Sequence, residues 1–268
     1  MRTSGQPTGE GARTVLPSGE PGQPPAPEAD LDLTLVLPYF NPGPALRTTV
    51  EEVAATLGAT GASFEIIAVS DGSTDGSERS IEGLFPESLV QVVLPGRRGK
   101  GEALRSGFKM GRGRYIGFID ADGDIPPQLL GAFVDIMRAE RPDIILGSKR
   151  HPASQVVYPL MRRLYSWAYQ QAVRWGFGLH VTDTQAGIKL VRREVLAEVL
   201  PRTVVEGFAF DLELLVLAHR LGYRAVVEAP VEIRRRFSST ISLRAVMATT
   251  VETAGIWWRL HVTRAYRL

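Results

Sequence analysis

The chain has 268 residues, of which 44% are hydrophobic and 22% are charged, as in an ordinary globular protein with one large domain or two small ones. The formal net charge of +2 is too small to argue for nucleic-acid binding, and the lack of cysteine excludes a disulfide framework, a thiolate metal site and a cysteine nucleophile. We expect a cytoplasmic protein, because the N-terminus lacks a signal-peptide pattern and no segment approaches the roughly 20 apolar residues that span a bilayer.

The first 30 residues are rich in Pro, Gly, Ser and Thr, so we expect residues 1–30 to form a disordered N-terminal tail. A folded domain is predicted over 31–233, in which apolar runs alternate with helically spaced segments. The expected strands are 33–37, 64–70, 90–94, 115–119 and 144–147. The expected helices are 45–57, 75–84, 101–110 and 127–138. This alternation predicts an α/β fold with a mostly parallel sheet and helices on both faces.

Beyond residue 150 the predicted helices are longer. They cover 159–175, 208–221 and 242–264, with one further strand over 225–231. The last helix belongs to a basic amphipathic segment, 234–268, which holds seven arginines and one acidic residue, Glu252. Arginine on one face and tryptophan, here Trp257 and Trp258, on the other are typical of helices that lie in a membrane interface. The alternative is a C-terminal helix that packs on the domain.

Polar residues follow three of the predicted strands: Asn41 the first, Asp71 the second, and Asp120 and Asp122 the fourth. Ligands of α/β sheets bind at the carboxyl ends of the strands, so these residues are candidates for one site. We expect one of the carboxylates of Asp120 and Asp122 to face a metal and diphosphate and the other to face a nucleotide. Mg²⁺ typically binds one or two protein carboxylates together with substrate phosphates. The alternative is a polar turn with solvated aspartates.

Three neighbouring motifs each allow two interpretations. Asp71 would accept hydrogen bonds from a base or ribose, although Asp71-Gly72-Ser73 also suits a strand–helix turn because glycine permits tight turns. Phe40, near the end of the first strand, would stack on a base or belong to the core. Lys100 follows Gly-flanked arginines just before a predicted helix, where the helix N-terminus suits an anion. The loop lacks the P-loop pattern, and the alternative is a solvated basic loop.

Together these motifs resemble those of family 2 glycosyltransferases with the GT-A fold, in the branch of the polyprenyl-phosphate glycosyl synthases. The resemblance extends over 33–243 and is carried, in order, by 70–76, 99–103, 120–124, 147–149, 183–189 and 208–213. The last two stretches look like those of dolichyl-phosphate glucose synthases. Three positions depart from the family pattern. Pro42 replaces a frequent Glu, Ser70 replaces the first of two aspartates, and Lys149 replaces Arg and so loses bidentate phosphate geometry.

The resemblance implies a role for each matching residue. Those that would contact the nucleotide are Pro38, Phe40, Asn41, Asp71, Lys100 and Asp120. A metal ion, Mg²⁺ or Mn²⁺, and the donor diphosphate would be held by Asp120 and Asp122, with Gln128 nearby. The residues that would bind phosphate groups or shape the sugar and acceptor pocket are Lys149, Arg162, Ser166, Asp183, Gln185, Lys189 and Arg236. Asp211 would be a base in a hydroxyl-transferring relative; here it would bind a sugar hydroxyl or orient Lys189.

The resemblance therefore implies an inverting transfer of a hexose from a nucleoside-diphosphate sugar, with UDP-glucose favoured, to a polyprenyl phosphate at the inner face of a membrane. A phosphate monoester needs no general base, because its second pKa is about 6 and it is largely ionised near neutral pH. Alternatives are a GDP-mannose or UDP-N-acetylhexosamine donor, and a hydroxyl acceptor with Asp211 as base. A non-catalytic protein that binds a nucleotide or lipid, and a nucleotidyltransferase, are alternatives outside this class.

Overall fold

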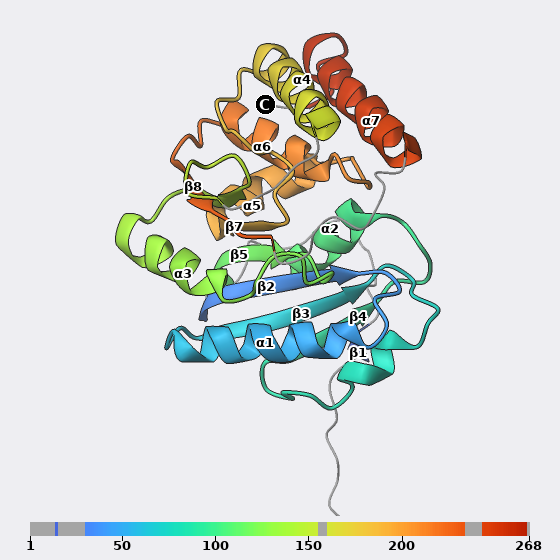
Figure 1. The fold of residues 1–268 in the computed structure, drawn as a ribbon, viewed down its shortest axis with the longest axis vertical. Helices are drawn as coiled ribbons and strands as arrows, with labels where there is room; N and C mark the ends of the chain where they lie inside the picture. The colour runs from blue at the N-terminus through green and yellow to red at the C-terminus, as the bar shows by residue number, and fades with distance from the viewer. Residues whose placement is uncertain (1–13, 16–29, 155–159, 234–242, 267–268) are drawn as a thin grey trace, which may run out of the picture.

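A computed structural model describes residues 14–15, 30–154, 160–233 and 243–266 of the chain. The described strands are β1 (Thr14–Val15), β2 (Leu31–Tyr39), β3 (Phe64–Ser70), β4 (Leu89–Val93), β5 (Gly113–Ile119), β6 (Ile144–Ser148), β7 (Ile188–Arg192) and β8 (Val226–Pro230). The described helices are α1 (Ala45–Ala59), α2 (Lys100–Met110), α3 (Leu129–Glu140), α4 (Leu160–Phe177), α5 (Arg193–Val199), α6 (Phe210–Arg220) and α7 (Leu243–His261), with short 3-10 helices η1 (Ser77–Ile81) and η2 (Leu200–Arg202). Figure 1 shows their arrangement.

The strands form one sheet in the order β1-β4-β3-β2-β5-β7-β6-β8. Strands β3, β2 and β5 are neighbours and run parallel, so their carboxyl ends lie at the same edge of the sheet. Strand β7 is antiparallel to both β5 and β6, and β6 pairs in parallel with β8. A mostly parallel α/β sheet, as the sequence predicts, is thus confirmed, with β7 inserted in the opposite direction.

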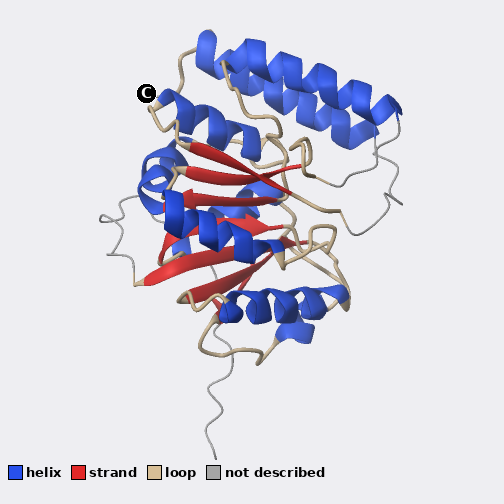
Figure 2. Ribbon diagram, turned by 60° about the vertical axis from the view of Figure 1, so that its left-hand side comes forward, coloured by secondary structure: helices blue, strands red, loops and turns tan. Residues whose placement is uncertain are grey.

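The core lies on both faces of the sheet, because side chains alternate along each strand. Leu35 of β2 packs with Leu46 of α1 and Phe133 of α3 on one face. The next residue of β2, Val36, packs with Phe108 of α2 and Leu212 of α6 on the other. All these side chains are buried, and burial of one such side chain stabilises the fold by roughly 1.5–3 kcal/mol. Helices therefore cover both faces, as Figure 2 shows.

The predicted helix over 75–84 is wrong, since only the short η1 forms there. Gly76 and Gly83 adopt left-handed backbone conformations with φ of 75°, which an α-helix does not allow. Ser77 donates its hydroxyl to Asp75, and this local bond competes with helical pairing. Within the predicted tail, Thr14 and Val15 pair with β4, whereas residues 1–13 and 16–29 lie outside the described part, so the disorder of that tail stays a prediction.

Helices α4 and α7 lie side by side at one end of the molecule, as Figures 1 and 2 both show. The hydroxyl groups of Tyr169 in α4 and Thr253 in α7 share a hydrogen bond of 3.2 Å, and His261 contacts the carbonyl oxygen of Gly176 at 3.0 Å. Ile256 of α7 is completely buried against the domain. The predicted C-terminal helix therefore forms and packs on the domain. Neither it nor any other described helix has the length and apolar composition that crossing a bilayer requires.

Candidate active site

The loops that follow β2 and β3 are tied together at the carboxyl edge of the sheet. Asn41 adopts a left-handed conformation with φ of 49°, and its side-chain oxygen accepts the Thr74 N–H at 2.7 Å. Its own N–H donates to the Ser73 hydroxyl at 3.0 Å. Phe40 is exposed, and the Arg97 guanidinium lies 4.1 Å from the centre of its ring. Phe40 is therefore not a core residue, which leaves it accessible for stacking beside a cation.

Asp71 holds the loop that leads into α2. One oxygen of its buried carboxylate accepts the backbone N–H groups of Arg98 at 2.7 Å and Gly99 at 3.0 Å, and the other also accepts Gly99. The two loops approach so closely that a Cβ atom on Gly72 would lie 2.5 Å from the carbonyl carbon of Gly96. Asp71 therefore shapes the loop that leads to Lys100. Its contact with a nucleotide stays a prediction.

Four charged residues form a continuous network beneath this loop. Lys100 Nζ lies 2.7 Å from Asp120 Oδ1 and 3.5 Å from Asp211 Oδ2. Lys189 Nζ lies 2.9 Å from Asp211 Oδ1 and donates to the carbonyl oxygen of Ala186 at 2.8 Å. The two ammonium groups and two carboxylates balance in charge. The network joins α2, β7 and α6 to the end of β5.

The lysines of this network respond to burial in different ways. Burial alone would lower the pKa of Lys100, but the carboxylates of Asp120 and Asp211 outweigh it and hold that pKa above its usual value. Burial lowers the pKa of Lys189, and Asp211 offsets the effect only in part. Both ammonium groups also face the ring of Phe118, at 4.6 Å for Lys100 and 5.2 Å for Lys189. The ring stabilises the cations in this partly buried setting.

Asp120 and Asp122 differ in their surroundings. Asp120 donates its N–H to the carbonyl oxygen of Gly187 at 2.9 Å, and a Cβ atom on Gly187 would lie 2.3 Å from Asp120 Oδ2. Asp122 is exposed at the surface, and one of its oxygens accepts the Asp124 N–H at 3.0 Å. Partial desolvation, followed by the charge of Asp120, raises the pKa of Asp122. Glycine at position 187 is thus required for Asp120 to lie where it does.

The donor set of these two residues suits a hard divalent cation. Among the described residues, no group of three or more His, Cys, Asp or Glu side chains is arranged to hold a metal ion. Two carboxylates with phosphate and water oxygens are nevertheless a usual Mg²⁺ coordination. Gln128 lies exposed at the N-terminus of α3, eight residues after Asp120 in the chain. The arrangement fits a metal that binds together with a diphosphate.

A second polar group lies at the end of β6 and before β7. Asp183 accepts the backbone N–H groups of Lys149 at 3.2 Å and Gln185 at 3.1 Å. Arg150 donates to the Ser166 hydroxyl of α4 at 3.1 Å. Within the described part of the chain, the Thr184 hydroxyl and the Gln185 side-chain nitrogen are buried without a hydrogen-bond partner. Such groups are rare in proteins and favour a polar ligand at this point.

Two of the predicted phosphate-binding residues are not placed by the structure. Arg162 lies in α4, but its side chain is outside the described part of the chain, and Arg236 falls wholly outside the described residues. Sequence reasoning missed two contributors that the structure reveals, Arg97 against Phe40 and Gly187 against Asp120. In the sequence, the arginine pair before Lys100 and the glycine inside the 183–189 motif could have indicated these two contacts.

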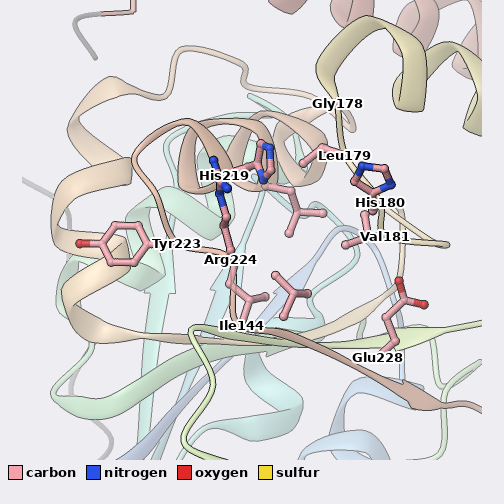
Figure 3. A pocket seen from close by; sticks show the side chains of 11 residues that line it. Ile144, Gly178, Leu179, His180, Val181, His219, Tyr223, Arg224 and Glu228 are labelled. Carbon is pink, nitrogen blue, oxygen red and sulfur yellow. The ribbon is translucent and has the colours of Figure 1, made fainter.

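A pocket of about 480 Å³ lies elsewhere, between α6, β6, β8 and the loop after α4. Figure 3 shows His180, His219 and Arg224 around it. Ile144 and Val226, at the starts of β6 and β8, line it, and none of the predicted site residues does. Burial, followed by the charge of Arg224, lowers the pKa of His219. The pocket is therefore separate from the carboxyl-edge site.

Comparison with known proteins identifies the family. The sequence model described as "Glycosyl transferase family 2" matches residues 34–200, more than half of the chain. The chain belongs to glycosyltransferase family 2. This family 2 chain is 31% identical to "Dolichyl-phosphate beta-glucosyltransferase" of Drosophila melanogaster over 71% of its own length and 64% of the relative's. It is 31% identical to the protein of that name from Dictyostelium discoideum, over 59% and 52%. The expected similarity to this branch is confirmed.

A further relative and a solved structure are also similar to the chain. The "Undecaprenyl-phosphate mannosyltransferase" of Micrococcus luteus is 30% identical over 64% of the family 2 chain and 72% of the relative. The crystal structure of glucosyl-3-phosphoglycerate synthase from Mycobacterium tuberculosis, solved with Mn²⁺ and UDP, superposes with a TM-score of 0.64 at 21% identity, over 86% of this chain and 80% of that one. That likeness shows the GT-A fold. The chain spans only about half to two thirds of the Dictyostelium and Drosophila relatives, 52% and 64%.

Proposed function

We propose that this chain is an inverting, metal-dependent glycosyltransferase that moves a hexose from a nucleoside-diphosphate sugar to a polyprenyl phosphate. UDP-glucose is the favoured donor, because the dolichyl-phosphate relatives are named beta-glucosyltransferases. The mannosyltransferase relative keeps GDP-mannose as an alternative, and UDP-N-acetylhexosamine is a third.

The state of Asp211 carries the proposal. Its carboxylate is only 3% exposed, and both of its oxygens face lysine ammonium groups, Lys189 at 2.9 Å and Lys100 at 3.5 Å. A general base must reach the proton that it removes, but both oxygens of this buried carboxylate are already occupied by ammonium groups. A hydroxyl acceptor would need such a base, whereas a phosphate monoester is already an anion near neutral pH. The environment of Asp211 therefore supports a phosphate acceptor.

In the proposed reaction, an acceptor phosphate oxygen attacks the anomeric carbon from the face opposite the leaving group. A new bond forms between that oxygen and the carbon, the bond from the carbon to the diphosphate oxygen breaks, and the nucleoside diphosphate leaves with the electron pair. Lys149 and the arginines near it would hold the anionic acceptor, and Lys100 would neutralise phosphate charge at the end of α2. Asp120 and Asp122 would hold Mg²⁺ or Mn²⁺, which when bound stabilises charge on the departing diphosphate.

The direct test incubates the purified chain with polyprenyl phosphate and each radiolabelled donor, UDP-glucose, GDP-mannose and UDP-N-acetylglucosamine, in the presence of Mn²⁺. We expect label in an organic-extractable, mild-acid-labile product, with UDP-glucose the best donor. Asp122→Ala should lose nearly all transfer while staying folded. The matched control is Asp135→Ala, which removes an exposed aspartate of α3 and should keep normal turnover. Near-normal transfer by the Asp122 variant would remove the metal-site assignment.

The alternative function is transfer of the sugar to a hydroxyl acceptor, with Asp211 as the general base. It predicts no lipid-linked label, and label in a water-soluble or polysaccharide product instead. A non-catalytic protein predicts neither product. The same incubation, with the aqueous and organic phases counted separately, distinguishes these outcomes.

We also propose that α4 and α7 contact the membrane that contains the acceptor. Large apolar side chains stand exposed on both helices: Trp167 and Trp175 on α4, and Met247, Val251 and Trp258 on α7. Tryptophan beside basic residues is typical of interfacial helices, and each basic residue near an anionic surface adds about 1 kcal/mol of binding free energy.

Anionic liposomes should carry the chain in a flotation gradient, and the double substitution Val251→Ser with Trp258→Ser should weaken liposome binding. Phe85→Ser, a control at an exposed phenylalanine distant in sequence, should not. Absence of flotation by the full chain would remove the idea.

A further inference from the structure

A loop of residues 203–209, between η2 and α6, packs directly on the N-terminus of α2. The carbonyl oxygen of Glu206 accepts the Glu102 N–H at 3.2 Å, and that of Val205 accepts the Arg105 guanidinium at 2.9 Å. The contact is close, since a Cβ atom on Gly99 would lie 2.5 Å from the Glu206 oxygen. Gly99 also has φ of 114°, which side chains rarely adopt. The loop therefore fixes where α2 begins.

The first residue of α2 is Lys100, so this loop also helps to determine the position of the Lys100 side chain. Lys100 Nζ reaches Asp120 and Asp211. On the other side of the same turn, Asp71 accepts the N–H groups of Arg98 and Gly99. The N-terminus of α2 is thus held from two directions, by Asp71 and by the 203–209 loop.

The loop is itself held by carboxylates that come from outside it. Glu213 of α6, which is fully buried, accepts the N–H groups of Val204 and Val205 at 2.9 Å each. Its other oxygen accepts the Tyr266 hydroxyl at 2.5 Å, from the segment that follows α7. Glu252 of α7 accepts the Ala209 N–H at 2.9 Å. Both ends of the loop therefore depend on the C-terminal part of the chain.

Glu252 is well placed for this task. It is the single acidic residue of 234–268, and a Cβ atom on Gly207 would lie 2.0 Å from its second oxygen, so the carboxylate lies flat against the loop. The exposed face of α7 carries Met247, Val251 and Trp258. Helix α7 thus binds the 203–209 loop through the Glu252 carboxylate and exposes apolar side chains on its outer face.

We propose that Glu252 is a positioning residue for the donor site. By holding the 203–209 loop, Glu252 positions the N-terminus of α2 and with it Lys100. The position of α7 on the domain therefore determines the affinity for the nucleoside diphosphate. The inference rests on the proposed function for its ligand, but the mechanical link from Glu252 to α2 does not. The competing explanation is that Glu252 only fastens α7 to the domain.

Three variants separate the two explanations. Glu252→Ala removes the acceptor of the Ala209 N–H, whereas Glu252→Gln keeps an acceptor oxygen at the same place. Thr253→Ala is the matched control, because it removes the hydrogen bond between α7 and Tyr169 of α4 without touching the loop. Two measurements are made on each full-length variant: hydrogen exchange of the Glu102 amide, and UDP affinity by titration calorimetry with Mn²⁺. The thermal unfolding temperature of each variant measures its loss of overall stability.

We expect Glu252→Ala to speed exchange of the Glu102 amide and to weaken UDP binding by about 5-fold or more, the range of a typical coupling between sites. Glu252→Gln should restore both toward the parent protein, and Thr253→Ala should change neither even where it lowers the unfolding temperature. Unchanged Glu102 exchange in Glu252→Ala, or equal effects of Glu252→Ala and Thr253→Ala on UDP affinity, would overturn the proposal. A parent chain that binds no UDP would contradict the proposed function, while Glu102 exchange would still test the link.

Discussion

Replacing Asp211 with Asn tests the charge network by removing one of its two carboxylates. Asp211 is 3% exposed and Lys189 is 1% exposed, so the pair has almost no access to water. Breaking a buried ion pair by neutralising one partner costs about 3–5 kcal/mol, because the remaining charge is left uncompensated. An ordinary domain has roughly 5–15 kcal/mol of stability, so the variant should fold with a much smaller margin.

The pH dependence of this loss has a definite sign. The pKa of Lys189 already lies below its usual value of about 10.5, and the substitution should lower it further because the Asp211 charge raises it. When the folded pKa of a lysine is below the unfolded one, the unfolded chain binds more protons between the two values, so stability rises with pH there. The difference between the parent protein and Asp211→Asn should therefore shrink between neutral pH and mildly alkaline pH.

Urea unfolding of both proteins at neutral and mildly alkaline pH measures this directly. Asp135→Asn is the control, since it neutralises an exposed aspartate and should stay within about 0.5 kcal/mol of the parent. If Asp211→Asn unfolds at the same urea concentration as the parent yet loses transfer, the carboxylate is not a structural counter-ion. The hydroxyl-acceptor mechanism with Asp211 as base would then replace the phosphate-acceptor one.

Two further substitutions test neighbouring parts of the structure. Gly187→Ala would place a Cβ atom 2.3 Å from Asp120 Oδ2, so we expect about 1–3 kcal/mol of lost stability and weaker Mn²⁺-dependent UDP binding, measured by thermal unfolding and calorimetry. Gly131→Ala, in helix α3 where nothing lies within 4 Å of the added Cβ atom, should lose no stability and keep normal UDP binding, and identical behaviour of the two variants would contradict the packing at Asp120. Burial raises the pKa of Tyr39 to about 12, so its share of stability should decline as pH rises from the unfolded value of about 10 toward 12. Tyr39→Phe should remove up to roughly 3 kcal/mol of this alkaline loss in urea unfolding, and equal alkaline losses in both proteins would disprove that origin.

Local patterns predict the part of the fold and site that depends on short segments. Asp71, Asp120 and Asp122 follow apolar runs that form β3 and β5, and the strand rule alone brings them to one edge of the sheet. The helix over 75–84 fails for an equally local reason, because glycine and serine at its ends favour turns over a continuous helix. Greater weight on Gly76 and Gly83 would have predicted turns there in place of a continuous helix.

Contacts between distant segments lie beyond sequence patterns. The family resemblance suggests that Asp211 orients Lys189, but the residue patterns do not, because this pairing depends on β7 running antiparallel between β5 and β6. Likewise, nothing near Glu252 in the chain indicates that its carboxylate reaches Ala209, 43 residues earlier. These contacts depend on how whole helices and strands pack together, which local sequence patterns do not determine.

The pairing of Lys100 with Asp120 has a consequence for the order in which ligands arrive. A divalent cation that approaches alone meets a carboxylate already neutralised by an ammonium group 2.7 Å away, so it must compete with that internal cation. A diphosphate that arrives with the cation offers the ammonium group a new anionic partner, and the exchange then conserves the balance of charge. We therefore expect metal and nucleotide to bind with strong mutual cooperativity, each weak alone, and the ligand-free protein to be stable without either.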